Sequence, residues 1–264
     1  MSTEVSTPQK RKRSWGGVFR AFGRAHRKAS AQMESSAPLL KHLDELRQRL
    51  FKAFLALIVT TAISFAFSQQ VIEYLSGPIG GVENLVSIEI TENIAIFMKI
   101  ALLGGFVLAM PVIVYQIMAF VVPGLKGNER VWLIVMVPFA SLLFAAGVVF
   151  TWFVMLPTAI PFLTGFMGIT TQPRPENYFD FITRLMFWIG ICFEMPLIVM
   201  FLAKLKFVTA KQLASGWRYA IVAMALIAAA VTPTVDPINM GLVMAPLMGL
   251  YVVSIILAAI VGRG

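Results

Sequence analysis

The residues FITRLMFWIGICFEMPLIVMFLA, from Phe181 to Ala203, form an apolar run long enough to cross a membrane, yet they include the acid Glu194 and the proline Pro196. A membrane-spanning helix needs about 20 mostly apolar residues, because the hydrocarbon core is about 30 Å thick. Five more apolar runs occupy residues 51–68, 94–122, 131–156, 219–231 and 238–261. This pattern predicts an all-α, polytopic membrane protein with six transmembrane helices.

The composition supports a membrane location. Of the 264 residues, 58% are hydrophobic and 13% are charged, whereas about 25% of the residues of a typical soluble domain are charged. The net charge is +9, and 12 of the 22 Lys and Arg residues precede residue 53, while the rest lie mostly in short gaps between apolar runs. Such a distribution is typical of membrane flanks, so we expect no nucleic-acid partner.

The chain offers little for metal, redox or catalytic chemistry. The single cysteine, Cys192, excludes an internal disulfide, and the isolated His26 and His42 cannot form a metal site of the usual three or four ligands. At membrane depth there is no Ser/His pair, no paired aspartates and no ligand cluster, so an intramembrane enzyme ranks low. We expect no cofactor, no metal and no enzymatic activity.

Residues 1–37 differ from the rest of the chain. They are polar and basic, with the cluster KRKRS starting at Lys10, and they show no sustained apolar period. We interpret them as a flexible cytoplasmic tail whose charges face solvent or anionic lipid. Residues 38–264 are then the six-helix membrane domain.

The gaps between the apolar runs alternate in charge. Residues 69–93 hold four Glu and no base, whereas residues 204–218 hold four bases and no acid. By the positive-inside rule, both termini are expected in the cytoplasm. The fifth run has 13 residues and covers only about 20 Å, so it either fails to cross, crosses a thinned bilayer, or extends over Trp217 and Thr232. The alternation of charge favours a crossing.

Two further patterns concern the shape and packing of the helices. Prolines inside the runs remove backbone donors and predict bent helices that enclose a concave face; they are Pro111, Pro138, Pro196 and Pro246. Small residues recur every four positions in the second and sixth runs, which favours close helix packing in lipid. They are Ala101, Gly105 and Ala109, and Gly241, Ala245 and Gly249.

Several motifs point to one family. KHLDELRQRL, from Lys41 to Leu50, places three leucines on one helical face and predicts an interfacial amphipathic turn. Its residues HLDELRQRL resemble the N-terminal motif of the TatC family, the multispanning core subunit of the twin-arginine, Sec-independent protein translocase. LSGP, MPVIVYQIMAFVVPGLKGNER, GICFEMP and TPTVDPINM resemble, in order, the family's first outer loop, second helix with first cytoplasmic loop, fourth helix and last outer turn. The chain departs from the family in its long tail, in Val131 where a second base often follows, and in Asn239 where some members have Gln.

The resemblance implies a function. Such a subunit is expected to bind signal peptides with an Arg-Arg pair at its cytoplasmic face and to support export of folded proteins driven by the protonmotive force. The implied partners are single-span subunits of the TatA/TatB type, the folded substrates, membrane lipids and further copies of the chain. The implied location is the plasma (inner) membrane of a prokaryote.

A receptor for paired arginines needs cytoplasmic carboxylates, because a guanidinium pairs bidentately with a carboxylate and a lysine cannot. The resemblance assigns this role to Glu45 and Glu129, and it places Arg47, Gln116 and Phe120 near the same surface.

The residues alone leave simpler roles open for this group. Glu45 and Arg49 are spaced as a surface pair on one helix, worth about 0.2–0.5 kcal/mol. Glu129 has Lys126 and Arg130 as neighbours in the sequence. Phe120 is also typical of an ordinary lipid-facing or core aromatic residue.

An ionised Glu in hydrocarbon costs about 3 kcal/mol or more, so Glu194 is expected to be protonated or turned toward a polar partner or water. The resemblance places it on a concave wall where the signal peptide and single-span partners dock, and gives Pro78 and Asp236 structural or partner-binding roles in the outer loops. The alternative is a proton-coupled small-solute transporter that uses Glu194 with Lys99 or Arg184.

Overall fold

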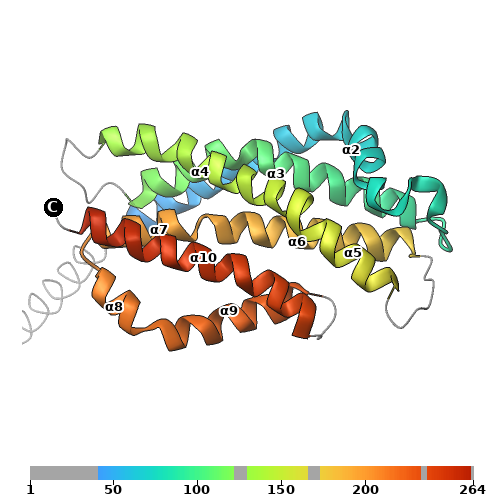
Figure 1. The fold of residues 1–264 in the computed structure, drawn as a ribbon. Helices are drawn as coiled ribbons and strands as arrows, with labels where there is room; N and C mark the ends of the chain where they lie inside the picture. The colour runs from blue at the N-terminus through green and yellow to red at the C-terminus, as the bar shows by residue number, and fades with distance from the viewer. Residues whose placement is uncertain (1–40, 122–129, 166–172, 233–236, 263–264) are drawn as a thin grey trace, which may run out of the picture. The chain divides into compact units, whose positions relative to one another are not determined.

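The computed structural model describes residues 41–121, 130–165, 173–232 and 237–262. The chain falls into two units, Met1–Arg49 and Leu50–Gly264, and each is described by itself. The first helix is Lys41–Phe65. It is followed by α2 (Ser68–Leu75), η1 (Gly77–Ile79), η2 (Val82–Asn84), α3 (Glu92–Val121), α4 (Arg130–Phe150), the π-helical turn η5 (Thr151–Met155), α5 (Leu156–Gly165), α6 (Pro175–Phe193), α7 (Met195–Lys204), α8 (Ala210–Ser215), α9 (Trp217–Val231) and α10 (Pro237–Val261). Throughout the described ranges the regular elements are helical, as predicted (Figure 1).

Five helical stretches are long and apolar enough to cross a membrane: Lys41–Phe65, Glu92–Phe120, Val135–Gly165, Pro175–Lys204 and Met240–Val261. The chain is therefore a multi-pass membrane protein. The fifth predicted span is α9, which takes in Trp217 at its start and reaches 15 residues, or about 22 Å. It remains shorter than the hydrocarbon core, so the crossing of α9 stays a prediction.

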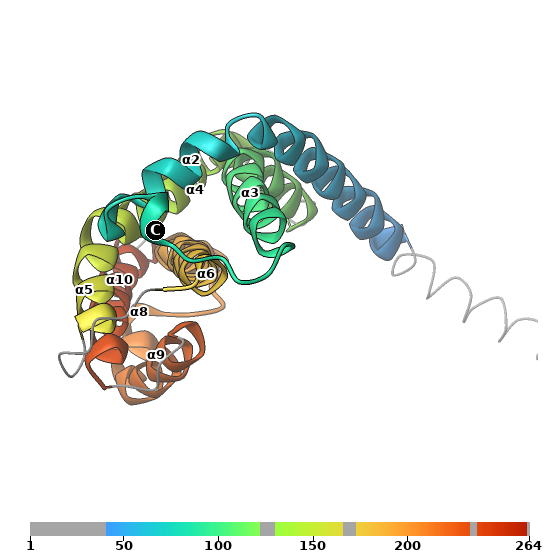
Figure 2. The ribbon, with the colours of Figure 1, turned by 90° about the vertical axis from the view of Figure 1, so that its right-hand side faces the viewer.

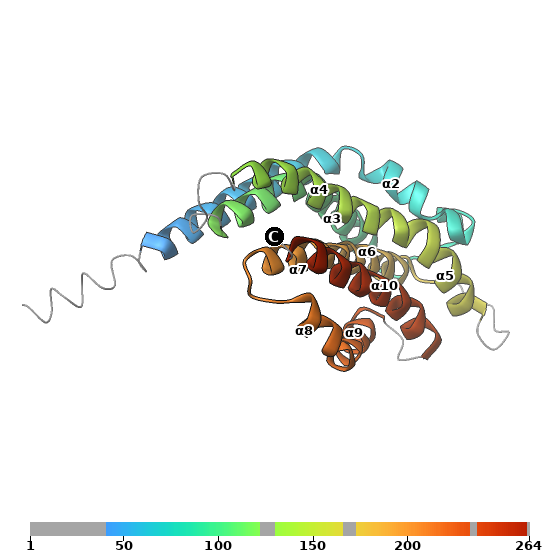
Figure 3. The same cartoon turned by 60° about the vertical axis from the view of Figure 1, so that its left-hand side comes forward.

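Within the Leu50–Gly264 unit, α6 is the most enclosed helix. It packs against α3 and α4, and its continuation α7 packs along α10. Figure 2 looks almost along α6 and shows α3 and α4 beside it. Figure 3 shows α8 following the end of α7 and leading into α9, which lies next to α10.

The two small-residue stripes behave differently. Ala101, Gly105 and Ala109 of α3 are buried, and a Cβ added to Gly105 would lie 2.5 Å from the Thr61 Cα of the first helix. This confirms the predicted packing role for the second run. The stripe on α10 is exposed, and Gly241 and Gly249 have no neighbour for an added Cβ within 4 Å. Packing within the described chain therefore does not account for the second stripe.

The prolines also differ in effect. The helix breaks before Pro196, where α6 ends at Phe193 and α7 begins at Met195. Helices α3, α4 and α10 continue across their own prolines, which are Pro111, Pro138 and Pro246.

Candidate functional site

Glu194 occupies the junction between α6 and α7. Pro196 has no N–H with which to continue the helical hydrogen bonds, and the backbone turns at Glu194 with φ −74° and ψ −15°. The Glu194 N–H donates to the Ile191 carbonyl at 3.0 Å, and its own carbonyl accepts from the Ile198 N–H at 3.0 Å. The acid therefore lies at a helix break inside a membrane-length helical stretch. The backbone N–H and carbonyl of Glu194 both keep a hydrogen bond across this break.

Close packing of α6 against α4 fixes the position of this junction. An added Cβ on Gly190 would lie 2.6 Å from the Phe144 ring, and one on Gly147 would lie 2.8 Å from the Gly190 Cα. Phe144 is fully buried. Glu194 follows Gly190 by one helical turn, so it lies on nearly the same side of α6. The glycines thus bring the two backbones together just before the acid.

The Glu194 side chain is turned into the protein, with 8% of the residue exposed. Its Oε1 atom is buried and has no hydrogen-bond partner among the described residues. A buried polar atom without a partner costs about 1–3 kcal/mol. The described residues therefore leave this oxygen without a donor, although it is closed off from solvent.

Glu45 belongs to the Met1–Arg49 unit and is half-buried. The Arg49 Nε donates to Glu45 Oε1 at 3.0 Å, and the Arg49 Nη2 donates to the same oxygen. The His42 Nδ1 lies 3.8 Å from the other oxygen, and Arg47 is exposed. The simpler role predicted for Glu45, a pair with Arg49 on one helix, is thus present. Leu43 and Leu46 are exposed on the amphipathic turn, which suits an interfacial position.

Gln116 and Phe120 lie near the end of α3, four residues apart and therefore on one helical face. Both are half-buried. Glu129, the second acid expected to recognise arginine, lies outside the described residues, as does Asp236.

Pro78 lies in η1, just after α2, and is exposed. The chain just before this turn is bonded to α6, since the Tyr178 hydroxyl donates to the Leu75 carbonyl at 2.7 Å. Gly80 ends the turn at φ 85°, a conformation that favours glycine. Pro78 therefore occupies a well-defined turn held by α6.

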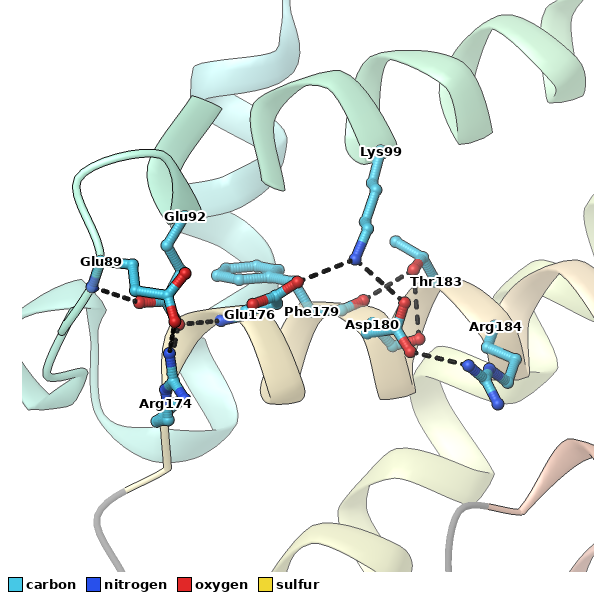
Figure 4. Close-up of polar contacts among 9 residues, drawn as sticks. All are labelled: Glu89, Glu92, Lys99, Arg174, Glu176, Phe179, Asp180, Thr183 and Arg184. Atoms are coloured by element: carbon cyan, nitrogen blue, oxygen red, sulfur yellow. Dashed lines mark hydrogen bonds and ion pairs between the residues drawn. The ribbon is translucent and has the colours of Figure 1, made fainter. Parts of the chain in front are cut away.

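A polar network that the sequence did not predict joins the start of α3 to the start of α6 (Figure 4). The Glu92 side chain is fully buried. It accepts hydrogen bonds from Ser87 Oγ and the Ile88 N–H at 3.1 Å each, and from the Glu176 N–H at 3.1 Å. Arg174 Nε lies 3.6 Å from the same carboxylate. One carboxylate thereby orders the loop before α3 and the first turn of α6.

The network continues along α3 and α6. The Lys99 Nζ donates to Asp180 Oδ1 at 3.1 Å and lies 3.8 Å from Glu176 Oε1, while Arg184 Nη2 donates to Asp180 Oδ2 at 2.9 Å. Asp180 and Glu194 are separated by about 20 Å along the helix axis. Lys99 and Arg184 therefore pair with Asp180 rather than with Glu194, and the two groups do not form one continuous site.

The ion pairs share a cavity with apolar side chains. The cavity has a volume of about 400 Å³ and is lined by Lys99, Asp180 and Arg184 together with Leu57 of the first helix, Phe106 of α3 and Trp188 of α6. Sequence reasoning singled out Lys99 and Arg184 but did not predict that they pair with Asp180, because Lys99 and Asp180 are 81 positions apart in the chain. The i,i+4 spacing of Asp180 and Arg184 was the signal that the sequence offered for this pairing.

The fold and the site together define a multi-pass α-helical membrane protein with a buried acid inside one membrane-length stretch, the kind of group that membrane transport proteins use. The family model for the Sec-independent protein translocase protein (TatC) matches residues 41–246, and the chain belongs to the TatC family.

The relatives of the chain agree with this assignment. The Sec-independent protein translocase protein TatC of Deinococcus radiodurans is 37% identical over 235 residues, covering 86% of this chain and 87% of the relative. The TatC protein of Aquifex aeolicus is 37% identical over 234 residues, covering 86% and 96%. A crystal structure of a twin-arginine translocase receptor, TatC, in DDM superimposes with a TM-score of 0.75 at 36% identity, covering 82% of this chain and 99% of that one.

Family membership confirms the predicted resemblance and fold class and makes the chain a component of a protein translocase, not an enzyme. Neither the family model nor these relatives support the alternative of a proton-coupled small-solute transporter.

Proposed function

We propose that the chain is the signal-peptide receptor and core subunit of a twin-arginine translocase in the inner membrane of a prokaryote. It binds Arg-Arg signal peptides of folded proteins at its cytoplasmic face and organises single-span TatA/TatB-like partners for export driven by the protonmotive force. The observation that carries the proposal is the likeness to a twin-arginine translocase receptor over 82% of the chain.

The proposed topology has six spans and both termini in the cytoplasm. Residues 1–37 form the basic tail, and residues 38–264 form the membrane domain. The alternation of acidic and basic gaps supports it. A crossing by α9 is required, and its 15 residues then demand a locally thin bilayer or a partner around its ends.

Glu45 and Glu129 are proposed to receive the two signal arginines. Glu45 already accepts two N–H groups from the Arg49 guanidinium, so its carboxylate suits an arginine fork. A surface pair on one helix stabilises by only about 0.3–0.5 kcal/mol, so an arginine of the signal peptide displaces Arg49 at little cost. Arg47, Gln116 and Phe120 are proposed to shape this surface.

Glu194 is proposed to hold the signal peptide or a partner helix in position. Its buried Oε1 has no donor within the described chain, and a donor from a docked helix satisfies it once the side chain turns outward. Pro78 and Asp236 are proposed to keep the outer loops in the form that partners contact.

The proposal is tested by export in cells that lack their own TatC. We expect the chain to export a folded reporter with an Arg-Arg signal only when the single-span subunits are co-expressed. Glu45→Gln and Glu129→Gln are expected to lower export strongly. Asp44→Asn, which changes a neighbouring exposed acid bonded to Gln48 at 3.2 Å, serves as the matched control and should leave export unchanged. Export that is independent of the single-span subunits would contradict the proposal.

A further inference from the structure

The end of α7 contains a turn that glycine usually makes. The Lys206 N–H donates to the Ala203 carbonyl and the Phe207 N–H donates to the Leu202 carbonyl, each at 3.0 Å. This is the Schellman pattern, in which the residue after the C-cap takes the left-handed conformation and is usually Gly. Here that residue is Lys206, with φ 63°. A lysine is less favourable than glycine in this conformation, so the turn itself gives no reason for a lysine at this position.

Phe207, the next residue, is also unusual. In a Schellman turn this position frequently packs against the last turn of the helix. Phe207 is instead 73% exposed. Lys206 thus departs from the usual residue type of a Schellman turn, and Phe207 departs from the usual burial of the next position.

Basic and aromatic residues continue through the next segment. Lys206, Lys211 and Arg218 are exposed, as are Phe207, Trp217 and Tyr219. The Arg218 guanidinium lies over the Trp217 ring, 5.7 Å from its centroid. No Asp or Glu occurs between Glu194 and Asp236. The segment therefore carries one sign of charge with interleaved aromatic rings.

The segment is held in a fixed shape. A capping box starts α8, in which the Gln212 N–H donates to Thr209 Oγ1 at 3.2 Å and the Thr209 N–H donates to Gln212 Oε1 at 2.9 Å. The Tyr251 hydroxyl of α10 donates to the Leu213 carbonyl at the other end of α8. Helix α8 is thereby tied to α10 while its lysine stays exposed.

We propose that the segment from Lys206 to Tyr219 is a binding surface for an anionic phospholipid. Lys206, Lys211 and Arg218 contact the phosphodiester oxygens, while Phe207, Trp217 and Tyr219 lie at the boundary between headgroups and acyl chains. Basic residues next to a membrane span attract anionic lipids, and Trp and Tyr prefer this boundary. Only the choice of the cytoplasmic leaflet rests on the proposed topology.

The surface also explains how the inner end of α9 is kept in place. Trp217 and Arg218 are the first two residues of α9. If they stay at headgroup level, a helix of 15 residues cannot slide inward to reach the opposite interface, so the bilayer beside it adapts.

The test uses the full chain in nanodiscs or mixed micelles, with phosphatidylglycerol as the probe and phosphatidylcholine as the reference lipid. Bound lipid is measured by native mass spectrometry, and melting temperature is measured on the same samples. We expect wild type to be enriched in phosphatidylglycerol. Lys206→Gly should reduce the enrichment several-fold while the melting temperature stays equal or rises, since glycine suits the turn better. Lys206→Arg should retain most of the enrichment.

The matched control is Lys52→Gln, which removes an exposed lysine of the first helix, at the start of the first apolar run. It should bind phosphatidylglycerol like wild type. Equal losses in Lys52→Gln and Lys206→Gly would reveal diffuse electrostatic attraction and overturn the proposed surface. Unchanged lipid binding in the triple variant Lys206→Gln, Lys211→Gln and Arg218→Gln would also overturn it. Binding of an Arg-Arg peptide to Lys206→Gly reports separately on the receptor function.

Discussion

The side chain of Glu194 is buried in its own chain, yet one of its carboxyl oxygens has no donor among the described residues. An unpaired buried oxygen costs free energy, and packing within the described residues does not account for it. This supports the proposal that another molecule docks beside the acid.

We predict that Glu194→Ala lowers export and signal-peptide cross-linking while the melting temperature stays equal or rises, since an unpaired buried oxygen is removed. Glu194→Gln keeps a polar group of similar size and should retain more export than Glu194→Ala. Reporter export and thermal unfolding in detergent check both. Wild-type export by Glu194→Ala would remove the proposed role.

Glu92 illustrates the opposite case, a buried carboxylate whose oxygens are well satisfied. We predict that Glu92→Ala lowers the melting temperature, because the backbone donors of Ile88 and Glu176 lose their acceptor. The control is Glu89→Ala, whose side chain is 64% exposed and pairs with Arg174 at 3.3 Å; it should have a small effect. An equal loss in both variants would show that Glu92 is not the centre of the network.

At the scale of elements, the contact between α4 and α6 sets the position of the acid. We predict that Gly190→Ala destabilises the protein by about 1–3 kcal/mol, as expected for overpacking, because the new methyl group meets the buried Phe144 ring. Gly249→Ala on α10 has open space around it and should change stability by less than about 0.5 kcal/mol. The free energy of unfolding of both variants is measured by denaturation in detergent. Equal losses in Gly190→Ala and Gly249→Ala would mean that α4 and α6 approach less closely than described.

Elements follow from the sequence where local chemistry decides them. Apolar run length predicted the long helices. Pro196 predicted a bend, and the structure has a helix break at this point, beside Glu194. The network of Glu92 with Arg174 and Glu176 was missed, because it joins residues more than 80 positions apart and periodicity does not report such contacts. The exposure of the small residues on α10 could not be predicted either, since small residues are equally suited to packing within a chain or against another one.

At the scale of the whole molecule, the family motifs carried the identification, since they occur in order along the chain. The six-span topology adds a prediction. In a Cys192→Ser background, Gln70→Cys and Val235→Cys should react with a membrane-impermeant maleimide in intact cells, whereas Ser2→Cys and Gly264→Cys should react only after lysis. Labelling of Val235→Cys only after lysis would mean that α9 does not cross.

The most direct test of the central claim is the binding of an Arg-Arg signal peptide and its Lys-Lys counterpart to the purified chain, with Asp44→Asn as the matched control. The receptor function predicts that wild type and Asp44→Asn prefer Arg-Arg by about tenfold or more, about 1.4 kcal/mol, because a lysine cannot reproduce the bidentate pair. Glu45→Gln or Glu129→Gln should abolish the preference. Equal binding of the two peptides by folded wild type would contradict the receptor function.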